Sequence, residues 1–252
     1  MERIMARNKA DTTKREILDV AMRMFLERGY SNTSIKAISD ELDISTGNLT
    51  FHYPTKEHLL AKLAGLLCEF QWKMMEQAVD EGETSLLALC MELAAMAVVC
   101  EEDEVARDFY LSAYKHNMSL DLIRKSDEKR AKHVFAQWCG CWSDAQFHQA
   151  EIIVSGIEYA TLMKTDDFPL EHRIEGALNV IMMIYNVPEN VRQKKIEKVL
   201  ALDYRQTGRR IMKDFEEYIN TENEQALEAA RKNVLQGGSI YERKNHKKNY
   251  KL

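Results

Sequence analysis

Helical periodicity is the feature that most constrains the fold of this chain. Apolar residues recur at spacings of three and four along nearly its whole length, and no segment shows a convincing strand alternation of apolar and polar residues. Only 3 prolines and 10 glycines interrupt the pattern in 252 residues. Because these residue types most often end helices, their scarcity favours long ones. With 45% hydrophobic residues available for a core, the sequence predicts an all-α fold.

Near the N-terminus, a helical pattern over residues 12–28 stops at Gly29, and two shorter patterns follow it. The first of these carries a small residue, Ser39, which lets the next helix cross closely. Asp43 occupies the turn between them, where a positive φ is common, and Asp tolerates that conformation better than most residues. Ile44 is then expected to fill the crevice between the two short helices.

The second short pattern, over residues 46–52, predicts a helix that is capped by Ser45 or Thr46 and cannot continue past Pro54. Leu49 is its inward anchor, and its other residues are mostly small or polar. A short helix with small polar residues in its first turn fits the major groove of DNA. The segment therefore predicts a helix-turn-helix DNA reader.

This segment resembles the tetracycline-repressor (TetR) family of transcriptional regulators. The resemblance covers roughly residues 12–63, and it departs from the family at Asp43, where many members have glycine. Thr50 stands where they usually have tyrosine, and Phe51 also lacks a hydroxyl. A three-helix bundle without a DNA role is the alternative interpretation. The matching residues are Phe25, Gly29, Tyr30, Thr33, Ile38, Leu42, Asp43, Ile44, Ser45, Gly47, Leu49, His52, Tyr53, Lys56, Glu57, Leu59 and Leu60.

The resemblance implies an N-terminal three-helix helix-turn-helix DNA-binding domain followed by a larger helical ligand-binding and dimerisation domain. The expected boundaries are 1–55 for the N-terminal arm and reader, 56–236 for the effector-binding body, and 237–252 for a basic C-terminal tail. Within the reader, Thr33, His52 and Lys56 would contact phosphates, while Thr46, Gly47 and Asn48 would approach base edges. The full set of candidate DNA-binding residues is Lys14, Arg15, Thr33, Ser34, Ser45, Thr46, Gly47, Asn48, Thr50, Phe51, His52, Tyr53 and Lys56.

The charge of the reader is balanced. Residues 1–60 hold nine basic and nine acidic side chains, and the whole chain has a net charge of −5. Non-specific affinity for DNA should therefore be modest, because phosphate contacts and counterion release supply most of it. The positive charge gathers in residues 1–15, which would either lie along the DNA as an arm or remain a solvated terminus.

Behind the reader, helical patterns run over residues 56–81, 85–100, 104–117, 120–141, 144–164, 170–186, 188–204, 206–219 and 222–235. The two at 144–164 and 170–186 are more apolar than one buried face requires. They form either the centre of the monomer core or an interface with a second copy, and the family resemblance implies the interface of a homodimer. The candidate dimer residues are Ile153, Ile157, Val180 and Ile184.

Aromatic and methionine residues gather between the reader and the expected interface. The resemblance implies an effector pocket there, although such residues at helical spacing are more often plain core. Glu92, Arg107, Asp108, His116, His133 and Glu158 are the polar candidates to orient a ligand. The candidate pocket residues are Met91, Phe109, Tyr110, Tyr114, Phe135, Trp138 and Trp142.

Cys139 and Cys141 invite a metal or redox interpretation. On a regular helix, however, residues two apart point about 200° from each other, so the two thiols would not share a metal unless Gly140 broke the helix. A buried structural pair of cysteines is the favoured reading. No metal site and no cofactor is predicted.

The sequence favours a ligand-controlled, DNA-binding homodimer, most often a repressor in this family. It carries no G-x-S-x-G sequence, no glycine-rich phosphate loop and no paired-histidine metal motif, so no enzyme is predicted. A thiol- or metal-responsive regulator on the same scaffold and a helical adaptor with a degenerate reader are the alternatives. The expected partners are operator DNA of two-fold symmetry and a small-molecule effector. With no apolar signal region at the N-terminus, the cytoplasm is the expected location.

Overall fold

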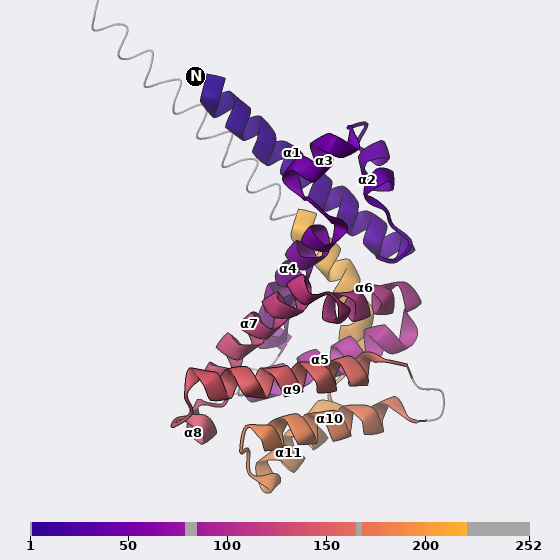
Figure 1. The fold of residues 1–252 in the computed structure, drawn as a ribbon. Coiled ribbons are helices and arrows are strands. Elements are labelled where there is room, and N and C mark those ends of the chain that lie inside the picture. Colours follow the sequence, from indigo (N-terminus) through magenta and orange to yellow (C-terminus); the bar gives the residue numbers. More distant parts are fainter. Residues whose placement is uncertain (1, 79–84, 165–167, 221–252) are drawn as a thin grey trace, which may run out of the picture.

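The computed structural model describes residues 2–78, 85–164 and 168–220, and among these residues helices are the only regular structure (Figure 1). The predicted all-α fold is confirmed. The labelled helices are α1 (Glu2–Arg28), α2 (Ile35–Glu41), α3 (Thr46–His52), α4 (Lys56–Ala78), α5 (Ser85–Glu102), α6 (Glu104–Lys115), α7 (Asn117–Val134), α8 (Ala136–Cys139), α9 (Asp144–Leu162), α10 (Leu170–Ile184) and α11 (Glu189–Ala201). A further helix covers residues 204–220.

Helices α1, α2 and α3 form the reader at one end of the molecule (Figure 1). Their shared core is made of side chains that are fully buried, among them Ile17, Phe25, Ile38 and Leu49. Helix α4 begins at Lys56, as predicted, and runs from the reader into the larger helical body, where it packs along α5 and α7 (Figure 1). One continuous helix therefore belongs to both parts of the molecule.

Helix α5 is the centre of the body. Every residue from Leu86 to Cys100 except Leu89 is buried. A helix that is apolar on all sides is stable only when other helices surround it. Here α4, α6, α9, α10 and α11 all pack against it, so α5 holds the remaining helices of the body in fixed positions.

The helix boundaries differ from the prediction most clearly at three places. Helix α1 begins at Glu2 rather than near Thr12, so the expected arm is helical; its residues are mostly strong helix formers such as Ala, Arg, Lys and Glu. The break before α7 lies at His116 rather than Ser119, whose hydroxyl donates to the carbonyls of Ala113 and His116. Phe135 divides the helix expected over 120–141 into α7 and α8.

One predicted helix cap can be checked in the structure, whereas the predictions for the C-terminal segments cannot. The capping box at Ser143 is confirmed, since its N–H donates to the side-chain oxygen of Gln146 at 2.9 Å. The helix expected over 222–235 and the basic tail over 237–252 lie outside the described residues. In the part of the chain that the structure describes, no helix is both long and apolar enough to cross a membrane.

Gly208 marks the closest approach of the helix over residues 204–220 to α5. A Cβ atom at Gly208 would lie 2.7 Å from the Ala95 carbonyl oxygen and 2.8 Å from the Val98 Cβ. Gly208→Ala should therefore lower the free energy of unfolding by roughly 1–3 kcal/mol, the cost of overpacking. The matched control is Gly65→Ala, because nothing lies within 4 Å of a Cβ there. That change should stabilise α4 by up to about 1 kcal/mol. Chemical denaturation measures both, and equal effects would contradict the close contact.

Candidate nucleic-acid interface and candidate effector cavity

The turn between α2 and α3 has the geometry that the sequence predicts. Asp43 has a φ of 51°, and the N–H of Ile44 donates to the Ser39 carbonyl at 3.0 Å. Ser39 is 1% exposed where the two helices cross. The Ser45 hydroxyl accepts from the Asn48 N–H at 3.1 Å and caps α3. These local contacts fix the angle at which α3 leaves the turn.

Helix α3 presents one face to solvent. Leu49 is fully buried, whereas Thr46, Gly47 and Asn48 are exposed and Phe51 is 81% exposed. Within the described residues, no hydrogen bond occupies the Asn48 side chain. A Cβ added at Gly47 would meet nothing closer than the Ser45 Oγ at 3.9 Å, so the backbone there is open to an approaching surface. The outward face is thus small and polar in its first turn and aromatic at its end.

Two of the candidate DNA-binding residues, Thr33 and Tyr53, have buried side chains that bond within the reader. Thr33 is 2% exposed, and its hydroxyl donates to the carbonyls of Met24 at 3.2 Å and Gly29 at 2.8 Å. Tyr53 is also buried, its hydroxyl donates to the Lys14 carbonyl at 3.3 Å, and burial raises its pKa to about 12. Both residues hold α1 against the rest of the reader.

Lys56 has a structural role that the sequence did not reveal. Its half-buried ammonium donates to the carbonyls of Tyr30 and Thr33, both at 2.9 Å, and lies 4.0 Å from the centre of the Tyr30 ring. Burial lowers the pKa of Lys56. The residue ties the start of α4 to the loop between α1 and α2, and this engagement leaves little of the ammonium for a phosphate.

The remaining candidates surround the exposed face of α3. Ser34 and Ser45 are N-caps whose hydroxyls still have a hydrogen to donate, and Lys14 is exposed. The Thr50 hydroxyl donates back to the Thr46 carbonyl at 3.0 Å, which leaves only its lone pairs free. The other candidates, Arg15 and His52, are half-buried.

The loop between α1 and α2 docks on α6 of the body. The N–H and hydroxyl of Ser31 donate to the two carboxylate oxygens of Asp108, at 2.8 Å and 2.5 Å. Gly29 has a φ of +89°, and a Cβ there would lie 2.9 Å from Asp108 Oδ2. The rings of Tyr30 and His116 meet edge to face at 5.3 Å. Helix α6 is therefore joined to the reader by a short, polar contact.

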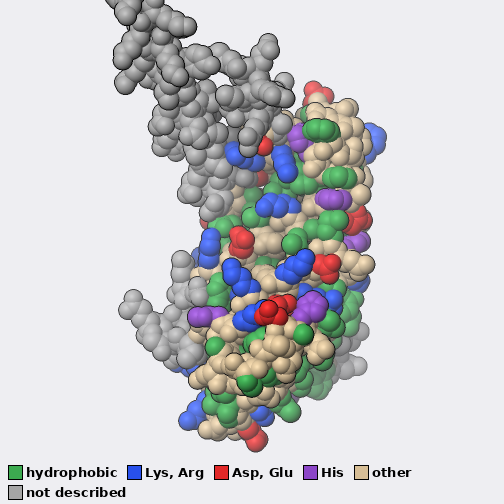
Figure 2. All heavy atoms as spheres, turned by 60° about the vertical axis from the view of Figure 1, so that its left-hand side comes forward, with side chains coloured by type: hydrophobic (Ala, Val, Ile, Leu, Met, Phe, Trp, Pro, Cys, Tyr) green, Lys and Arg blue, Asp and Glu red, His purple; other side chains and the backbone are tan. Residues whose placement is uncertain are grey.

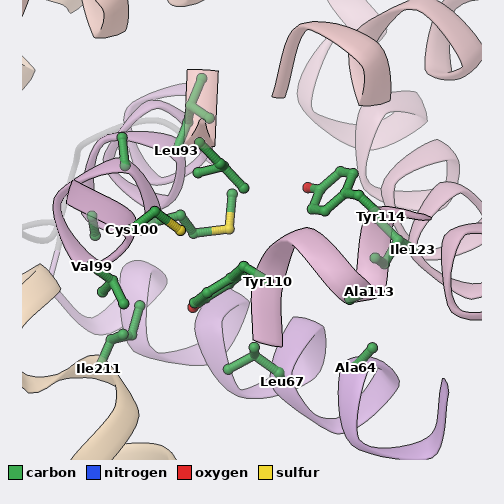
Figure 3. Close-up of a cluster of buried hydrophobic side chains, with 14 of the residues drawn as sticks. Ala64, Leu67, Leu93, Val99, Cys100, Tyr110, Ala113, Tyr114, Ile123 and Ile211 are labelled. Carbon is green, nitrogen blue, oxygen red and sulfur yellow. The ribbon is translucent and has the colours of Figure 1, made fainter. Parts of the chain in front are cut away.

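A cavity of about 50 Å³ lies in the body between α4, α5, α6, α7, α9 and α10. We call it the central cavity. A water molecule needs roughly 10–15 Å³ on the same measure, so the space suits a few waters or a small organic molecule. Figure 3 shows Tyr110 and Tyr114 of α6 near Leu93 of α5 and Leu67 of α4. Four of the seven candidate pocket residues line this cavity: Phe109, Tyr110, Tyr114 and Phe135.

The other three candidates lie elsewhere. Met91 is buried in α5 but does not line the central cavity. Trp138 packs beside Phe135, with ring centres 6.3 Å apart, and Trp142 packs on Phe147 at 5.3 Å. Periodicity marks both tryptophans as core-facing, but it does not tell which side of the core contains the space.

The polar lining of the central cavity is dominated by acids. The Arg130 guanidinium donates to both carboxylate oxygens of Glu92, at 3.0 and 2.9 Å, and also to Asp127. It lies 5.2 Å from the Trp72 ring. In this cluster, one guanidinium group is paired with two carboxylates. Glu92 was among the polar candidates from the sequence, whereas Asp127 and Arg130 were not.

Glu151 and Glu158 complete the acidic lining, and their partners are tyrosines. Tyr185 donates to Glu151 Oε1, and Tyr114 donates to Glu158 Oε2 at 3.0 Å. The second oxygen of Glu151 is buried without a partner among the described residues. Burial raises the pKa of Glu151 to about 8 and that of Glu158 well above its usual range. The sequence analysis named only Glu158. The signal that could have marked the pair is the spacing of two glutamates seven residues apart on an apolar helix.

Helices α9 and α10 lie side by side and expose apolar side chains (Figure 1). Ile153 and Val180, two of the candidate dimer residues, are 57% and 44% exposed, and Met183 is 51% exposed. The other two candidates, Ile157 and Ile184, are half-buried against the core. In contrast, Figure 2 shows basic and acidic side chains interspersed over a neighbouring face.

The two cysteines of the Cys-x-Cys pair differ in environment. Cys139 is buried, its thiol donates to the Tyr185 carbonyl at 3.1 Å, and burial raises its pKa. Cys141 is exposed. Residues 2–78, 85–164 and 168–220 contain no group of three side chains placed to hold a metal ion.

Comparisons with known proteins agree with this geometry. Residues 17–63 match the family model described as bacterial regulatory proteins, tetR family. The HTH-type transcriptional regulator QacR of Staphylococcus aureus is 29% identical over 139 residues, which cover 50% of this chain and 73% of QacR. AcrR of Shigella flexneri is 29% identical over 77 residues, which span only 32% of AcrR.

Among solved structures, Thermus thermophilus FadR, a TetR family repressor in complex with lauroyl-CoA, has the same fold. Its TM-score is 0.53 at 16% sequence identity, over 70% of this chain and 96% of FadR. The reader, the shared helix α4 and the helical body define a helix-turn-helix protein of two parts. The chain therefore resembles TetR-family regulators: residues 17–63 match the family model, and the fold is that of a solved TetR family repressor.

Proposed function

We propose that this protein is a sequence-specific DNA-binding transcriptional regulator that a small-molecule effector releases from its operator. The exposed face of α3 carries this proposal. Its first turn is small, polar and open, its position is fixed by two capped helices, and its buried side anchors it through Leu49. A helix presented in this way fits the major groove.

The exposed side chains divide by the contacts they can make. Asn48 has a free amide that can pair with an adenine edge, and Phe51 can contact a thymine methyl group. Ser34, Ser45, Lys14, Arg15 and His52 surround this face and are assigned to the phosphates. A structural role is assigned instead to Thr33, Tyr53 and Lys56, because their side chains donate hydrogen bonds to backbone carbonyls of the reader.

The operator-bound form is proposed to be a homodimer formed through α9 and α10. Exposed apolar side chains on both helices support this, because a contiguous apolar surface of a soluble protein commonly marks an interface. A two-fold dimer would present two copies of α3 to successive major grooves, and its operator would share that symmetry.

Control by an effector requires a physical link between the central cavity and the reader. Helix α6 supplies one, because Tyr110 and Tyr114 line the cavity while Asp108 of the same helix holds Ser31 of the reader. A ligand that displaces α6 would move this contact and the spacing of the two reading helices. It can shift the equilibrium only by its differential affinity for the two states.

Gly47→Ala separates DNA binding from folding. Because a Cβ at Gly47 meets open space, the change should leave stability unchanged or raise it by up to about 1 kcal/mol. The same methyl group would stand between the backbone and the DNA, so operator affinity should fall by roughly tenfold or more. Thermal melting and fluorescence anisotropy measure the two effects. Unchanged affinity would mean that α3 does not approach DNA through this residue.

A footprint on the DNA just upstream of the protein's own gene tests the proposed function. Under reducing conditions, a two-fold symmetric protected site is the expected result. If a folded, dimeric protein protects nothing there or at any genomic fragment selected with it, the proposal fails and the helical adaptor takes its place.

A further inference from the structure

We infer that the effector is an organic cation, held in the central cavity by Glu151 and Glu158 and by the aromatic rings that line the same space. This inference rests on the proposed function only in taking the central cavity as the effector site. The ligand class follows from the charge, the unpaired carboxylate oxygen and the aromatic walls of the cavity.

The cavity holds more negative than positive side chains. Glu92, Asp127, Glu151 and Glu158 line it, against one base, Arg130. The guanidinium of Arg130 is already engaged with Glu92 and Asp127. No salt bridge reaches Glu151 or Glu158 in the described part of the chain. Burial favours the neutral forms of these two acids, and a bound cation would stabilise their charged forms by pairing with them.

One carboxylate oxygen has no partner among the residues that the structure describes. Glu151 is 2% exposed, and its Oε2 is buried there without a hydrogen bond, while Tyr185 donates to its Oε1. An unpaired buried acceptor costs free energy that a ligand's positive group would recover. Seven residues along α9, Glu158 accepts from Tyr114 and from no other group in the described ranges. The two carboxylates therefore form a polar wall that is only half satisfied.

The other walls suit the body of an organic cation. Phe109, Tyr110, Tyr114, Phe135 and Tyr185 line the cavity, and the rings of Phe135 and Tyr185 stack 3.9 Å apart. Aromatic faces attract cations such as quaternary ammonium groups. Their apolar surface also favours a ligand with alkyl or aryl substituents. The same walls disfavour an anionic group inside the cavity, because it would face four acidic side chains.

Protonation links this site to pH. Burial raises the pKa of Glu151 to about 8, so the empty site holds a proton at neutral pH that a bound cation would displace into solvent. Affinity for a cation of fixed charge should therefore rise as the pH rises through 8. The titratable groups that line the cavity with Glu151 are Cys68 of α4, Glu92 of α5, Tyr110 and Tyr114 of α6, Asp127 and Arg130 of α7, Glu158 of α9 and Tyr185 at the end of α10. The charge of Glu128 of α7 also acts on Glu151.

Calorimetric titration of the full chain tests the inference, with tetramethylammonium as the probe, because its five heavy atoms match a cavity of about 50 Å³. Its control is tert-butanol, which is neutral and has the same number of heavy atoms. The cation should bind, and the neutral compound should bind about 10- to 100-fold more weakly. Equal binding of the two compounds, or no binding of the cation, would overturn the inference.

Variants locate the binding site. Glu151→Gln and Glu158→Gln should each weaken binding of tetramethylammonium by about tenfold or more. Both keep the shape of the side chain and remove an acid from the cavity wall, so their melting temperatures should not fall. The matched control is Glu197→Gln, at an exposed position of α11, which should bind as the original protein does. Wild-type affinity in both cavity variants would place the cation elsewhere and refute the assignment.

The test needs no DNA, so its failure is distinct from that of the proposed function. A protein that binds the cation through Glu151 but selects no DNA sequence would keep this site and lose its regulatory role. A protein that selects an operator but ignores the cation would keep its role as a regulator and lose this effector class.

Discussion

Arg130→Met is expected to lower the free energy of unfolding by about 3–5 kcal/mol. The side chain of Arg130 is 14% exposed, and it pairs with Glu92 and Asp127, whose side chains are 10% and 16% exposed. Removing the guanidinium leaves two carboxylates in the core without a cation. Methionine keeps most of the aliphatic volume, so the loss reports charge rather than packing. Urea denaturation at neutral pH measures it.

Two controls separate the buried charge from other effects of this substitution. Adding Glu92→Gln and Asp127→Asn to Arg130→Met should restore most of the lost stability, because the unpaired charges are then gone. Burial already raises the pKa of Glu92, so protonation of this carboxyl stabilises the folded state relative to the unfolded state. Without Arg130 this preference should grow, and the deficit should shrink as the pH falls from 8 towards 5. A deficit that is independent of pH and of the two added changes would contradict the account.

Asp108→Ala is expected to uncouple the body from the reader. The carboxylate accepts both the N–H and the hydroxyl of Ser31, and these are the hydrogen bonds that join α6 to the reader. Coupling between sites in such proteins is typically about 1–3 kcal/mol, and most of it should disappear. Folding should survive, because the cores of the reader and the body remain.

Reciprocity gives a measurement that requires no known effector. If effector binding in the central cavity changes the affinity for the operator, operator binding must change the affinity of the cavity for the effector by the same factor. Operator DNA should therefore alter hydrogen exchange along α6 in the original protein and in the control Asp121→Ala, at an exposed position of α7. In Asp108→Ala the operator should leave exchange of α6 unaltered. An unchanged response in that variant would show that coupling follows another route, such as α4.

Local signals explain which parts of the reader the sequence predicted. Helix α3 covers residues 46–52 and α4 begins at Lys56, as expected, because capping hydroxyls and Pro54 act on their immediate neighbours. The turn at Asp43 follows from the same local chemistry. The roles of Thr33 and Lys56 could not be predicted in this way, because their partners are backbone carbonyls that only the tertiary fold brings near.

The central cavity shows a second limit. Its lining comes from six helices, and periodicity gives the buried face of each helix but not the rotation of one helix against another. Phe109 and Phe135 were therefore predicted together with Met91 and Trp142, although only the first two face the space. Glu151 and Tyr185 were missed as a site because 34 residues separate them and only the packing of α9 on α10 joins them.

The measurement that tests the central claim most directly is selection of binding sites from random-sequence DNA by the purified full chain. It does not depend on where an operator lies in a genome. The account predicts enrichment of one two-fold symmetric sequence, and loss of that enrichment in the well-folded Gly47→Ala variant. Recovery of unselected sequence from a folded, dimeric protein would contradict the claim that α3 reads DNA.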